Sequence, residues 1–173
     1  AGMEKDYAQK GYERGFEFER HYHGCAQCVV GAVYEVFPEM RNVDIFRAAS
    51  GLAAGTGLTT TGQCGALTGA VMVLSQLYGR QLDQIDDPEK KRFVAYRLAE
   101  KMVHRFLKEY GTLICGEIQK KIMGRSFYLF DPEQWDAFEK AGGHNEKCPS
   151  VVGNATRWAI EVMEEQESEP IVS

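Results

Sequence analysis

The chain has 173 residues, of which 44% are hydrophobic, so one globular domain can bury its own core. Its net charge of −5 and its scattered basic residues argue against nucleic acid as a partner. No apolar stretch approaches the ~20 residues of a membrane-spanning helix, which argues against a membrane partner. The N-terminus lacks the apolar core of a signal peptide, so we expect a cytoplasmic protein.

Helical periodicity of the apolar residues runs through the first half of the chain. It predicts an amphipathic helix that ends around residues 23–24, and a second helix over 25–37 that Pro38 stops. A third helix is predicted over 43–51. A glycine-rich loop follows, and a central helix over 63–78 comes directly after it.

The second half is also predicted to be helical. Asp86-Asp87-Pro88 provides an N-cap and a first-turn proline for a long helix that ends at residue 110. Most of its buried stripe is predicted to be Phe93, Tyr96, Leu98, Val103, Phe106 and Leu107. Shorter helices are predicted over 115–122 and 132–140, and a last one over 150–165; residues 126–130 are the only strand candidate.

We therefore predict an all-α, single-domain helical bundle over residues 1–173. Its core would span about 12–164, followed by a frayed acidic tail over 165–173.

Four of the five cysteines stand where helices are predicted to begin. These are Cys25, Cys64, Cys115 and Cys148. The first N–H groups of a helix lack intrahelical partners and carry partial positive charge, so a thiol there is expected to become a thiolate more readily. This common placement predicts that the four sulfurs converge on one pocket as metal ligands.

Cys64 has the strongest local pattern, because glycines stand on both sides of it. Gly62 and Gly65 would let backbone or a cofactor approach closely, so we predict that both glycines contact a cofactor. The alternative is a tight contact between helices, which small residues also favour.

Cys25 and Cys28 form a C-x-x-C pair at a helix start. This spacing places both sulfurs on one face, close enough for a disulfide or for sharing a metal. Either thiol could instead be core packing, because free cysteine is among the most buried residue types. Val29 follows the pair where covalent haem attachment needs a histidine, so haem of that kind is excluded.

The histidines near these cysteines give less information. His21 and His23 could be ligands or proton donors, but a polar surface position is the favoured interpretation. His144 has no partner that the sequence identifies. Tyr34, Trp135 and Trp158 are predicted to be core residues.

The cysteine segments resemble the C_GCAxxG_C_C family of redox-active proteins. The resemblance is carried by Gly24-Cys25-Ala26-Gln27, by residues 62–70, by Cys115-Gly116-Glu117-Ile118 and by Cys148-Pro149. It runs from about residue 12 to residue 164. It implies a helical protein whose cysteines serve redox or iron–sulfur chemistry, similar to the split-Soret cytochromes but without haem.

The chain departs from the family pattern in two places. Gln63 directly precedes Cys64 and Gly65 follows it, so the glycine of the family's GCA core is displaced. Cys28 is an additional thiol, which complicates ligation by four cysteines and allows a disulfide with Cys25.

Three functions follow as hypotheses. The first is electron transfer through an iron–sulfur cluster or related metal, with Cys28 as an alternate ligand or redox partner. The second is a thiol–disulfide oxidoreductase or peroxide-reducing enzyme with Cys25 and Cys28 as catalytic residues. The third is a structural zinc-binding or sensing domain.

We also expect a homodimer, because a site beside a glycine-rich loop often needs a neighbour to exclude water. The sequence does not identify a redox partner protein.

Overall fold

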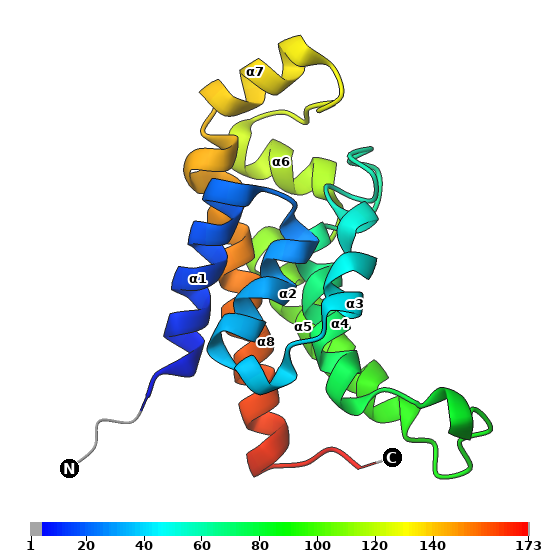
Figure 1. Ribbon diagram of the computed structural model, residues 1–173. Coiled ribbons are helices and arrows are strands. Elements are labelled where there is room, and N and C mark those ends of the chain that lie inside the picture. Colours follow the sequence, from blue (N-terminus) through cyan, green and yellow to red (C-terminus); the bar gives the residue numbers. More distant parts are fainter. Residues whose placement is uncertain (1–4, 173) are drawn as a thin grey trace.

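The computed structural model describes residues 5–172, and this part of the chain forms eight α-helices and no sheet (Figure 1). The helices are α1 (Tyr7–Tyr22), α2 (Cys25–Val36), α3 (Val43–Ala48), α4 (Gly65–Tyr78), α5 (Arg92–Tyr110), α6 (Cys115–Met123), α7 (Pro132–Lys140) and α8 (Cys148–Ser168). The predicted all-α, single-domain fold is confirmed. The strand candidate over 126–130 does not form a strand, and within the described residues the β-pairing is a single antiparallel bridge between Gln63 and Ile114.

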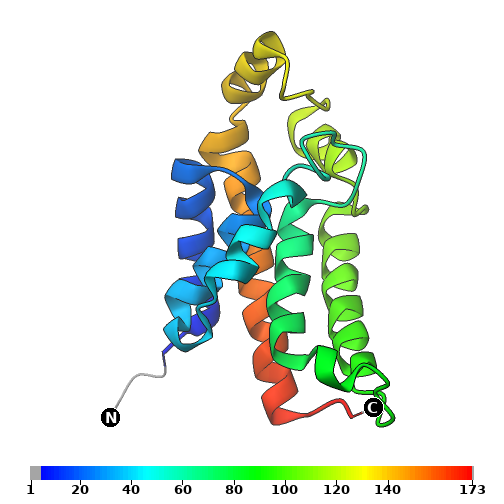
Figure 2. The same cartoon turned by 45° about the vertical axis from the view of Figure 1, so that its right-hand side comes forward.

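The five longer helices α1, α2, α4, α5 and α8 run along one bundle, and α8 packs against the other four. Helices α6 and α7 and the glycine-rich loop cover one end of this bundle, whereas α8 ends at the opposite end (Figures 1 and 2). Helices α2, α4 and α8 all begin at the covered end. The positive ends of three helix dipoles therefore point to the same region.

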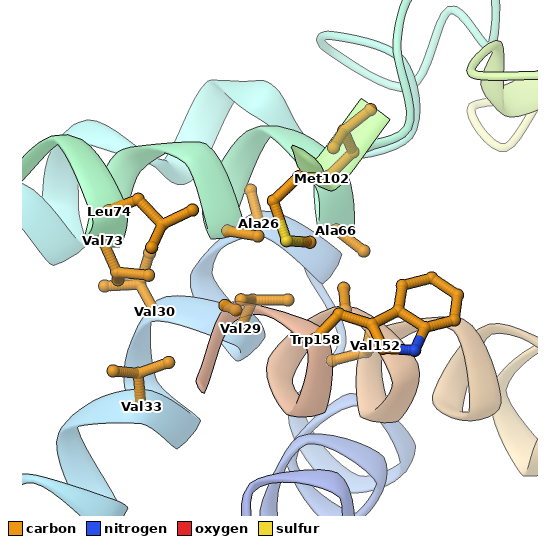
Figure 3. Packing of buried hydrophobic residues seen from close by; sticks show 14 of the residues in the cluster. Ala26, Val29, Val30, Val33, Ala66, Val73, Leu74, Met102, Val152 and Trp158 are labelled. Atoms are coloured by element: carbon orange, nitrogen blue, oxygen red, sulfur yellow. The ribbon is translucent and has the colours of Figure 1, made fainter. Parts of the chain in front are cut away.

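Small residues let the central helices approach closely. A Cβ added at Gly69 in α4 would lie 2.5 Å from the carbonyl oxygen of Ala26 in α2, so only glycine fits there. Figure 3 shows side chains from α2, α4, α5 and α8 filling the space between these helices, with Val30, Leu74 and Met102 fully or almost fully buried. Burial of each such side chain stabilises the fold by about 1.5–3 kcal/mol.

Helix α5 begins later than predicted, and a different stripe of it is buried. It starts at Arg92, because the chain first turns through residues 82–91, and the Asp87 carboxylate then accepts the N–H groups of Lys91 and Arg92. The predicted burial of Phe93, Tyr96 and Leu107 is wrong, since they are 42%, 56% and 44% exposed. The stripe that faces α4 and α8 follows the helical repeat of Ala95, Leu98, Met102, Phe106 and Tyr110.

The C-terminal segment is more ordered than a frayed tail from residue 165. Helix α8 continues to Ser168, and the Gln166 side chain then bonds both the N–H and the carbonyl of Ile171, at 2.9 Å and 3.0 Å. Residues 1–4 and 173, which the predicted domain and its tail also include, lie outside the described residues.

Candidate functional site

Four cysteines line one cavity at the covered end of the bundle. These are Cys25, Cys64, Cys115 and Cys148, the set that the sequence predicts to converge. The cavity has a volume of about 190 Å³. Because one water needs roughly 10–15 Å³ by the same measure, the cavity has room for a group much larger than a water molecule.

Each of the four thiols is positioned by the start of a helix. Cys25, Cys115 and Cys148 are the first residues of α2, α6 and α8, and Cys64 directly precedes α4. The bridge between residues 63 and 114 brings two of these starts together. The Cys64 N–H donates to the Leu113 carbonyl at 2.8 Å, and the Cys115 N–H donates to the Gly62 carbonyl at 2.9 Å.

The glycine-rich loop places a backbone donor against one sulfur. Residues 54–58 all have positive φ angles, between 46° and 76°, although three of them are not glycine. A left-handed conformation costs an L-residue roughly 1–2 kcal/mol. This strained turn places the Ala54 N–H 3.4 Å from Cys25 Sγ, in position to donate to it. Strain that is kept beside a cavity of thiols suggests that the loop serves the site.

The two glycines that flank Cys64 make room for this arrangement, and neither of them lines the cavity. A Cβ at Gly65 would overlap Cys25 Sγ and lie 2.7 Å from the Leu52 carbonyl oxygen. A Cβ at Gly62 would lie 2.6 Å from the Gly55 carbonyl oxygen. Both residues therefore allow backbone segments to pack closely, while their predicted contact with a cofactor stays a prediction.

Cys28 is separate from the other four thiols. It is 4% exposed, it does not line the cavity, and its Sγ donates to the His23 carbonyl at 3.1 Å. All five cysteines are free thiols. Of the two interpretations of the C-x-x-C pair, the structure matches core packing for Cys28, whereas Cys25 faces the cavity.

Burial controls the ionisation of these thiols. It raises the pKa of Cys64 and of Cys115 to about 12, and it raises the pKa of Cys25 and Cys148 well above the ordinary range. The N–H groups of Ala66 and Leu67 act in the opposite direction at Cys64 without cancelling the effect of burial. The expectation that helix starts would favour thiolates here is therefore wrong, because loss of hydration outweighs the backbone N–H groups that face the sulfur.

Sequence reasoning missed a second group in the same cavity, Glu19, His23 and His144. One ligand atom from each of these side chains lies within 4.8 Å of the others. Glu19 Oε1 is 3.9 Å from His144 Nε2, and the two imidazole rings are stacked with centroids 3.6 Å apart. His23 was predicted to lie on the surface. It is instead partly buried, and its ring lines the cavity.

The end of α1 explains the position of His23. Its backbone has φ 63° and ψ 174°, a region used almost only by glycine, which costs about 1–3 kcal/mol. The turn brings the ring Nδ1 to 2.9 Å from the carbonyl oxygen of Glu19. The sequence held a signal for this pair, because residues four apart share a helix face. His144 lies on a π-helical turn (η4, Gly143–Lys147) that leads into α8.

The Glu19 carboxyl is unusually isolated. Its side chain is 4% exposed, and its Oε2 is the single buried side-chain nitrogen or oxygen without a hydrogen-bond partner among residues 5–172. Burial raises the pKa of Glu19 to about 8, although the neighbouring Cys28 thiol acts in the opposite direction. Burial likewise lowers the pKa of His144, although its Glu139 partner raises it.

Aromatic side chains from α7 cover the histidines. Phe138 meets the ring of His144 edge-on at 4.8 Å, and the Trp135 ring lies 5.2 Å from it. Trp135 was predicted to be core and is partly buried against the cavity, whereas Tyr34 and Trp158 are buried as predicted. The cavity is thus shielded from water on this side.

Comparison with known proteins agrees with the cysteine pattern. Among residues 5–172, no helix is both long and apolar enough to span a membrane. No match was found for this chain among curated proteins or among solved structures. The model of the family described as "Putative redox-active protein (C_GCAxxG_C_C)" matches residues 23–162, which include all five cysteines. The chain therefore belongs to the C_GCAxxG_C_C family of redox-active proteins.

Proposed function

We propose that the protein transfers electrons through a metal centre held by Cys25, Cys64, Cys115 and Cys148, and that this centre is an iron–sulfur cluster. The observation that carries the proposal is the convergence of four thiols, each from a different helix start, on one buried cavity. Sets of four thiolates suit iron–sulfur clusters. Such a cluster supplies one-electron chemistry when it is bound.

The spacing of the thiols favours a cluster over a single zinc ion. Sulfurs bound at about 2.3 Å in a tetrahedron lie roughly 3.8 Å apart. Among residues 5–172, the groups of three side chains whose ligand atoms lie close enough to hold one metal ion do not include a set of thiols. A centre with several iron atoms accepts ligands that are farther apart, so the structural zinc alternative has less support.

The charge of the surroundings also fits a bound metal centre. The thiols keep their protons in the buried cavity, because their pKa values are raised by burial. A metal ion replaces these protons on binding. The negative charge that the thiolates then carry is offset by the starts of α2, α4 and α8 and by the Ala54 N–H that points at Cys25.

The thiol–disulfide alternative has less support from the same observations. That chemistry needs an exposed thiol of low pKa and a resolving thiol beside it. Cys28 is buried and donates its hydrogen to the His23 carbonyl, and burial raises the pKa of both Cys25 and Cys28.

Anaerobic reconstitution with ferrous iron and sulfide tests the proposal. We expect brown protein with visible absorption, with iron and acid-labile sulfide bound in equal amounts, and with the colour bleached by dithionite. Protein that stays colourless after reconstitution, or that binds iron without sulfide, would overturn the cluster.

Cys28 offers a matched control for the ligand set. Cys25→Ser should abolish the colour, whereas Cys28→Ser, one helical turn away, should retain the iron and sulfide of the wild-type protein. Circular dichroism checks that both variants remain helical. Loss of the cluster in Cys28→Ser and its retention in Cys25→Ser would contradict the assignment.

The expected homodimer belongs to the same proposal, since a site beside a glycine-rich loop often needs a neighbouring copy to exclude water. The chain has a mass of 19.4 kDa. Sedimentation of the reconstituted protein at twice this mass supports the dimer, and sedimentation at the monomer mass contradicts it.

A further inference from the structure

Three side chains that can bind a cation meet in the cavity without a hydrogen bond between them. They come from Glu19, His23 and His144, and the distances between their ligand atoms do not exceed 4.8 Å. Acceptors that face one another repel unless a proton or a cation lies between them. The buried Oε2 of Glu19 has no hydrogen-bond partner, which is an independent sign that the group is arranged for a positive charge, either the proton that Glu19 itself takes up or a bound cation.

The hydrogen bonds of the two histidines decide which nitrogen is free. Nδ1 of His23 lies 2.9 Å from the carbonyl oxygen of Glu19, and a carbonyl oxygen only accepts, so this nitrogen carries the hydrogen. Nδ1 of His144 donates to the Glu139 carboxylate in the same way. In the neutral rings this leaves Nε2 of both histidines with a free lone pair, and that of His144 faces Glu19.

These partners are the ones that metal-binding histidines use. A histidine ligand typically donates its other ring N–H to a backbone carbonyl or a carboxylate, which fixes the ring and its tautomer. His23 has the carbonyl partner and His144 has the carboxylate partner. The strained backbone of His23 and the π-helical turn under His144 further hold both rings toward Glu19.

We propose that Glu19, His23 and His144 bind a divalent transition-metal ion at a site distinct from the four cysteines. Two imidazoles and one carboxylate suit Fe²⁺, Zn²⁺ or Co²⁺, whereas Mg²⁺ and Ca²⁺ prefer oxygen ligands alone. Ligands bound at about 2.1 Å lie roughly 3.4 Å apart in a tetrahedron, so the 3.9 Å between Glu19 and His144 closes with a small shift. Three protein ligands leave a coordination position open toward the cavity, as in catalytic metal sites.

This site does not depend on the proposed iron–sulfur cluster, because its ligands are nitrogen and oxygen. Cobalt distinguishes the two sites by spectroscopy. Co²⁺ bound to nitrogen and oxygen gives weak ligand-field bands in the visible range, and Co²⁺ bound to thiolates adds intense sulfur-to-metal charge-transfer bands in the near ultraviolet.

The experiment titrates Co²⁺ into the metal-free Cys64→Ser/Cys115→Ser variant of the full chain. We expect one equivalent to bind with ligand-field bands only, and Zn²⁺ to displace it. Glu19→Gln should abolish this equivalent. His21→Gln, which changes an exposed histidine on the same helix, should leave it intact. Absence of the equivalent, or its persistence in Glu19→Gln, would overturn the site.

Two further measurements keep the test decisive. If the double cysteine variant does not fold, Glu19→Gln in the otherwise unchanged chain should lower bound Co²⁺ by one equivalent and leave the sulfur charge-transfer bands in place. Glu139→Gln should weaken Co²⁺ binding about 10–100-fold, because Glu139 positions His144 without touching the metal. Unchanged Co²⁺ binding in both variants would overturn the site.

Discussion

The packed middle of the bundle and the cavity at its covered end are built by the same helices, yet they differ in what fills them. In the middle, α2, α4 and α8 meet through apolar side chains, and within residues 5–172 no buried side-chain nitrogen or oxygen there lacks a hydrogen-bond partner. At the covered end, the first residues of these helices present thiols to a cavity, beside an unpartnered carboxyl and a left-handed turn. Burial of apolar side chains in the middle of the bundle therefore stabilises the fold. The left-handed turn and the unpartnered carboxyl, which cost stability, lie at the covered end, beside the candidate site.

The largest expected effect concerns the pH dependence of the metal-free protein. Glu19 keeps its proton in the folded state up to about pH 8, whereas the unfolded chain releases it near pH 4.5. Its contribution to stability is therefore complete below pH 4.5 and is lost as pH rises to about 8. Between pH 5 and 8 the loss is on the order of 4 kcal/mol.

The measurement compares urea unfolding of wild-type and Glu19→Gln protein with a chelator present. His144 acts in the opposite direction because its pKa is lowered, and His23 and Cys28 also face Glu19. The difference between the two proteins cancels these contributions. We expect the free energy of unfolding of Glu19→Gln, relative to that of the wild type, to rise steadily from pH 5 to pH 8. A difference between the two proteins that does not change with pH would contradict the buried, protonated carboxyl.

A new cavity made by mutation in the packed middle of the bundle should lower the stability of the fold without affecting the candidate site. Leu74 is 1% exposed, so Leu74→Ala should lower the free energy of unfolding by about 2–5 kcal/mol. Bound iron per folded chain should not change. Leu77→Ala on the same helix is the control, because Leu77 is 45% exposed and its truncation should have a smaller effect. Equal losses for both would mean that the packing of α4 is misassigned.

The smallest expected loss of stability comes from crowding the covered end. Gly65→Ala places a Cβ against Cys25 Sγ and the Leu52 carbonyl, which should destabilise by about 1–3 kcal/mol and reduce iron incorporation. Gly51→Ala is the matched control, because nothing lies within 4 Å of the added Cβ. Equal iron incorporation in Gly65→Ala and Gly51→Ala would contradict the role of Gly65 in making room for Cys25.

The cysteines could be found from sequence because local signals mark helix starts. Glycines around Cys64 and the proline after Cys148 identify such starts, and the cavity then collects the thiols that stand there. Glu19, His23 and His144 have a weaker signal, because the spacing of four residues relates Glu19 to His23 but nothing local relates either of them to His144. Glu19 resembles any charged residue on an amphipathic helix, and its burial becomes visible only when α8 and the turn before it pack against α1.

The sequence by itself determined the helical class, most helix boundaries and the family, because these depend on periodicity, capping residues and motifs close together in the chain. It did not determine which face of α5 is buried, since Phe93 and Tyr96 are as apolar as the residues that pack. Only the tertiary structure decided the ionisation of the thiols and the meeting of Glu19 with two histidines. Both depend on dehydration and on contacts between distant segments, which no local pattern encodes.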